Sequence, residues 1–135
     1  MRHESKLIAA TEGYQVYPGD ALRFTVTPPV GRWVWVVSVD GRGTVSRLVP
    51  AEADAPLEVH GRTTLPGSAI LDATPGPERI LAFFCESPAS FDEVATAIRI
   101  NLDREGISAD GVRTFSSGDL PCEAHATLLL ERAGP

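Results

Sequence analysis

Cys85 and three histidines are the side chains of this sequence that could carry out nucleophilic chemistry. Cys85 ends the apolar run RILAFFC, and a cysteine nucleophile needs an imidazole base within hydrogen-bond reach. His60 or His125 could supply that base, which would make the chain a cysteine-dependent hydrolase. No local protease signature surrounds Cys85, so two other roles stay open: a buried structural thiol, or one half of a disulfide with Cys122. The even cysteine count favours pairing if the compartment is oxidising.

Other catalytic and metal-binding patterns are absent from the sequence. His3, His60 and His125 do not have the spacing of zinc ligands on one helix face, and no Cys-x-x-Cys pair occurs. The serine-elbow pattern Gly-x-Ser-x-Gly is also missing. We therefore expect no catalytic, cofactor-binding or metal-binding residues, and a protein that is not an enzyme.

The stretch SVDGRGTV places two glycines after an aspartate, between two apolar runs. A phosphate-binding glycine loop would require a helix directly after it, but TVSRLV has the composition of a strand. Asp40, Gly41 and Gly43 therefore predict a structural hairpin turn in which glycine supplies a positive φ. The carboxylates of Asp40, Asp72 and Glu78 all fall in expected turns, and we expect them to be solvated charges.

Trp33 and Trp35 belong to a run that is apolar on both faces, residues 33–39. Such a run predicts a central strand covered on both sides, so we expect both indole rings to pack in the core. The alternative is an exposed aromatic platform on a β-sandwich that binds carbohydrate or another envelope ligand.

The elements that must position these residues are mostly short strands. Apolar and polar residues alternate over residues 21–27, as in a half-buried antiparallel strand, and residues 79–85 form a second core strand. Prolines and glycines separate the runs as turn residues. The expected strands are 6–10 continued at 14–17, then 21–27, 33–39, 44–49, 57–59, 69–71, 79–85 and 126–131.

Late in the chain the apolar period changes to that of a helix. Ser90 and Glu93 match a capping box, and Gly106 stands where a helix commonly ends. We expect one helix over about residues 90–104, inside an insertion at 89–118. Its apolar face consists of Phe91, Val94, Ile98 and Leu102. The fold class predicted is mainly β: an antiparallel sandwich of the Ig-like or Greek-key type, with seven or eight short strands and one late helix.

Length and charge restrict the class of partner. The chain has 135 residues and a formal net charge of −6, so we expect one domain over residues 1–135. Its basic residues are scattered singly, which argues against a nucleic-acid partner. No apolar run reaches 18 residues, so we expect no membrane insertion within this chain.

Three stretches together resemble a bacterial β-rich domain of unknown function. They are VYPGDALRFTV, RWVWVVSVDGRGTVSRLVP and TTLPGSAILDATPGPERILAFFCESP, and the similarity covers residues 16–88. The closing LPCEAHATLLLE is similar to the last strand of the form found in myxobacteria-like organisms, where a cysteine also precedes that strand. Residues 89–118 match only in being helical.

The resemblance implies a non-catalytic sensory or interaction domain. Such domains follow protein kinases or caspase-like peptidases, or the transmembrane helix of anti-sigma-type regulators, and the cysteine-containing form is most similar to the last. The chain is then expected to be one domain of a longer, membrane-anchored regulator. Its location would be extracytoplasmic, its ligand a protein partner or a small envelope molecule, and a Cys85–Cys122 bridge would be natural there.

Overall fold

A computed structural model describes most of the chain: residues 14–17, 21–27, 33–50, 55–65, 69–70, 76–105, 112 and 124–132. Ten strands and one long helix follow one another in this part. Their bounds are β1 (Tyr14–Val16), β2 (Ala21–Leu22), β3 (Thr25–Val26), β4 (Trp33–Asp40), β5 (Val45–Val49), β6 (Leu57–Glu58), β7 (Thr63–Thr64), β8 (Ala69–Ile70), β9 (Gly76–Cys85), α1 (Phe91–Glu105) and β10 (Ala124–Arg132).

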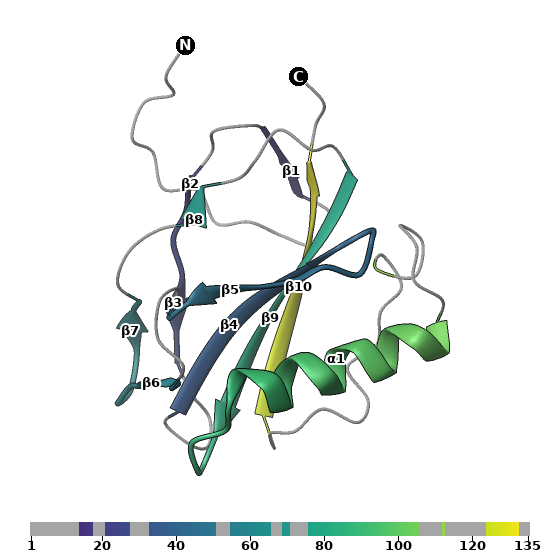
Figure 1. Ribbon diagram of the computed structural model, residues 1–135. Coiled ribbons are helices and arrows are strands. Elements are labelled where there is room, and N and C mark those ends of the chain that lie inside the picture. The colour runs from purple at the N-terminus through teal and green to yellow at the C-terminus, as the bar shows by residue number, and fades with distance from the viewer. Residues whose placement is uncertain are drawn as a thin grey trace.

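One six-stranded sheet forms the centre of the molecule. Its strands lie in the order β1-β10-β9-β4-β5, and β6 pairs with the first residues of β4. All pairs are antiparallel except β1 with β10, which is parallel. Strands β9 and β10 are adjacent although α1 lies between them in the chain (Figure 1). The connection that carries the helix therefore starts and ends on neighbouring strands.

Strands β4 and β9 are central because their residues are apolar on both faces. Odd-numbered residues such as Trp35 and Leu81 point to one core cluster, and even-numbered residues such as Val34 and Phe84 point to the other. The eight-residue register between the two strands runs from Trp33 opposite Cys85 to Asp40 opposite Glu78. Hydrophobic burial on both sides of this strand pair thus contributes a large part of the core.

Helix α1 covers the odd-numbered face of the sheet (Figure 1). Its residues Val94, Ile98 and Leu102 are fully buried there, as their helical spacing predicts. The Ser90 hydroxyl accepts a hydrogen bond from the backbone N–H of Glu93 at 3.1 Å, so Ser90 caps the helix N-terminus. The predicted start of the helix is confirmed.

Two short ribbons supply apolar residues to the opposite face. Strand β3 pairs with β7, and β2 pairs with β8. Val26 of β3 and Leu65, just after β7, are buried in the cluster formed by even-numbered residues of the sheet. Both faces of the main sheet are thereby covered, one by a helix and one by thin two-stranded ribbons.

The mainly β, predominantly antiparallel class is confirmed, together with its single late helix. One strand prediction is wrong in detail, because residues 21–27 form two separate two-residue strands whose side chains still alternate in burial. The expected strand at 6–10 lies outside the described residues. The strand pairs do not define an Ig-like or Greek-key sandwich, so that finer class stays a prediction.

Strand β9 begins at Gly76, three residues before the predicted start of the second core strand. Residues 76–78 already belong to β9, although Gly76 and Pro77 suggest a turn. Pro77 lies beyond Asp40, the last residue of β4 that pairs with β9, so no ladder hydrogen bond to β4 is lost at its nitrogen. Gly76 has a φ of 120°, which favours glycine at the start of this strand.

Candidate functional site

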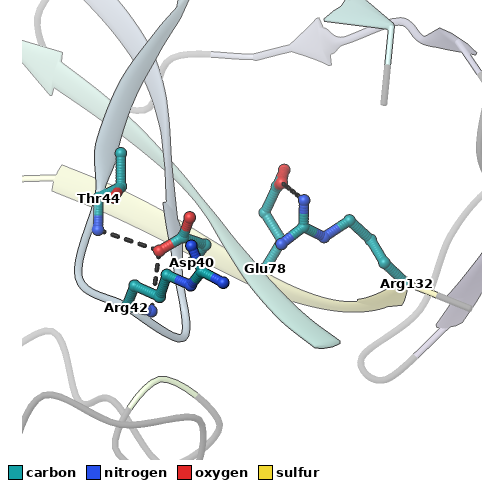
Figure 2. A network of polar contacts seen from close by, with 5 residues as sticks. All are labelled: Asp40, Arg42, Thr44, Glu78 and Arg132. Carbon is teal, nitrogen blue, oxygen red and sulfur yellow. Dashed lines mark hydrogen bonds and ion pairs between the residues drawn. The ribbon is translucent and has the colours of Figure 1, made fainter. Parts of the chain in front are cut away.

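Polar side chains from three strands gather at one end of the main sheet (Figure 2). Asp40 ends β4, Glu78 lies opposite it near the start of β9, and Arg132 ends β10. The two acidic side chains turn to different partners: Asp40 to its own turn, and Glu78 to Arg132 (Figure 2). These two sets of polar contacts therefore lie near each other at this end of the sheet.

The Asp40 side chain closes the turn between β4 and β5. Its Oδ1 accepts hydrogen bonds from the backbone N–H groups of Arg42 at 2.9 Å and Thr44 at 3.0 Å. The backbone N–H of Gly43 donates to the carbonyl of Asp40 at 3.0 Å, and Gly43 has a φ of 81°. The hairpin turn is confirmed. Its positive φ is at Gly43 and not at Gly41, and the carboxylate acts as an intrachain acceptor.

Glu78 and Arg132 form a buried ion pair, contrary to the expectation that Glu78 is a solvated turn charge. The Arg132 Nη1 lies 3.6 Å from the Glu78 Oε1, and their side chains are only 6% and 10% exposed. Burial of either charge alone would be costly, so the opposite charge of each residue compensates for the desolvation of the other. The turn residues around Glu78 suggested exposure. No local signal pointed to a partner 54 positions away.

Arg79, the next residue, is buried on the other face of β9, and sequence reasoning missed it as well. Its Nε donates to the carbonyl of Val112 at 3.0 Å, and its Nη1 donates to the Thr127 hydroxyl at 3.2 Å. The Val112 side chain is itself buried against the helix side of the sheet. Arg79 therefore links Val112 to strands β9 and β10.

Cys85 is disulfide-bonded and lies in the core at the end of β9. A sulfur in a disulfide has no thiolate, so in this state it cannot act as the nucleophile of a hydrolase. Its expected partner, Cys122, lies outside the described residues, and the pairing of these two cysteines stays a prediction.

The two histidines considered as bases for Cys85 lie on different parts of the chain, His60 just after β6 and His125 within β10. The His60 imidazole is exposed and its Nε2 lies 3.8 Å from the Glu58 carboxylate. His125 is placed by the backbone of β10 opposite Phe83, and His3 lies outside the described residues. The described contact of His60 is thus an exposed one on the protein surface.

Trp35 is a core residue, as predicted. Its ring is fully buried, and the indole N–H donates to the carbonyl of Ala89 at 2.8 Å. The centroid of the Phe91 ring lies 5.7 Å from that of the Trp35 ring. The Arg47 guanidinium carbon lies 5.3 Å from the Phe91 centroid, which is a cation–π contact. Trp33 is partly buried against the same cluster. Trp35 therefore cannot belong to an exposed aromatic platform.

The described residues contain no group of three or more His, Cys, Asp or Glu side chains that could hold a metal ion. Within the same part of the chain, no helix has both the length and the apolarity needed to cross a bilayer. Comparisons of the chain with protein-family models, curated proteins and solved structures found no significant match.

Proposed function

We propose that this chain is a non-catalytic sensory or interaction domain that works outside the cytoplasm, as the C-terminal part of a membrane-anchored bacterial regulator of the anti-sigma type. The observation that carries the proposal is the disulfide at Cys85. Disulfides persist in secreted and periplasmic proteins and are rare in the reducing cytosol. A buried disulfide at the end of a core strand is best explained as a structural crosslink in an exported domain.

The side chains considered above as candidates for catalysis or binding have structural partners, and this supports the non-catalytic part of the proposal. The Cys85 sulfur is in a disulfide, and the Trp35 indole is a buried hydrogen-bond donor. The Asp40 carboxylate is bound by two backbone amides of its own turn, and Glu78 is paired with Arg132. Each of these groups has a structural partner inside the fold, as expected if the domain acts through its surface and not by catalysis.

The proposal also includes the finer fold class and the class of ligand. An Ig-like or Greek-key sandwich is supported by the apolar cluster between the main sheet and the ribbons β2–β8 and β3–β7, since a sandwich buries the facing sides of two layers of strands. The ligand of such a regulator would be a protein partner or a small envelope molecule, as the resemblance implies.

The redox state of the cysteines in the natural cell tests the location. Cells that carry the natural gene are quenched with acid, and the denatured protein is alkylated with a maleimide reagent that adds a resolvable mass to each thiol. After digestion, mass spectrometry follows the peptides that contain Cys85 and Cys122, and we expect neither thiol to be labelled unless the sample is first reduced, when both are labelled. A Cys85→Ser variant is the matched control, since it should show one labelled thiol without reduction. Two labelled thiols in the unreduced wild-type protein would refute an oxidising location.

Crosslinking in the cell tests the interaction role separately. Ile100 is 49% exposed on the outer side of α1, so a photoreactive amino acid at this position should not disturb the core. We expect a discrete crosslinked product from the envelope fraction of the natural cells. The matched control carries the same amino acid in place of Arg62, which is exposed but does not lie on this helix. Equal products from both positions, or none from several exposed positions, would contradict an interaction surface on this helix.

A further inference from the structure

We draw no further inference here: the strongest candidate, the outer edge of strand β5 beside the Asp40–Thr44 turn at the end of the main sheet's strand order, carries nothing because nothing in the structure shows what covers it.

Discussion

Replacement of Glu78 by glutamine should destabilise the protein far more than an ordinary surface mutation. The substitution keeps the shape of the side chain but removes its charge, which leaves the Arg132 guanidinium charged at 6% exposure. Two unit charges 3.6 Å apart attract by about 5 kcal/mol at an effective dielectric constant of about 20. Loss of one partner of a buried ion pair generally costs about 3–5 kcal/mol, because the remaining charge stays desolvated. We expect Glu78→Gln to lower the free energy of unfolding by about 3 kcal/mol.

Urea unfolding followed by tryptophan fluorescence measures this change, since Trp35 is in the core and reports on its loss. The matched control is Glu58→Gln, which removes the exposed carboxylate that lies 3.8 Å from the His60 Nε2. Because exposed pairs contribute little, this control should change the free energy of unfolding by less than about 0.5 kcal/mol. Both proteins should be measured with the disulfide intact, so that only the ion pairs differ.

A double variant separates the ion pair from the general effect of a core mutation. Glu78→Leu combined with Arg132→Met replaces both charges with apolar groups, and buried pairs treated in this way often regain wild-type stability to within about 1 kcal/mol. We expect each single replacement to be more destabilising than the double, with a coupling energy of about 2 kcal/mol. If Glu78→Gln proves as mild as the Glu58→Gln control, the pair contributes nothing and its assignment as a core interaction is wrong.

Three further substitutions test local features of the fold. Trp35→Phe should cost about 2 kcal/mol in chemical unfolding, because it leaves the Ala89 carbonyl without its indole donor and creates a small cavity; an unchanged midpoint would contradict that hydrogen bond. Gly43→Ala should lower stability by about 1 kcal/mol in thermal unfolding, since alanine is strained at positive φ, whereas Gly41→Ala, at a position with no positive φ, should be milder. Ser90→Ala should cost about 1 kcal/mol through loss of the helix cap, and Ser90→Asp should restore it; equal stability of all three proteins would rule out the cap.

Features that depend on neighbours in the chain could be predicted from the sequence. The turn at Asp40 needs only acceptors and donors within four residues, and the cap at Ser90 needs an amide three residues later. The burial of α1 through Val94 and Ile98 follows from their helical spacing. These elements are encoded by local backbone geometry and by apolar period, so a single sequence contains the information.

Strand lengths and pairings were less predictable, because they depend on neighbours distant in the chain. A two-residue strand such as β7, Thr63–Thr64, has no apolar period of its own and exists only through its pairing with β3. The same holds for the start of β9 at Gly76, which is extended because β10 lies beside it down to Arg132. At this position the pairing with β10 outweighs the local preference of Gly76 and Pro77 for a turn.

The sequence by itself determined the mainly β class, the late helix, the hairpin turn and the two core strands, since each follows from short-range pattern. Only the tertiary structure decided which polar side chains are buried and which residues they pair with. Glu78 is a core residue because β10 brings Arg132 to it, and Arg79 is buried because Val112 and Thr127 accept its hydrogen bonds. Burial of a charge depends on which distant strand supplies its partner. The pattern of residues within a single strand does not specify that distant partner.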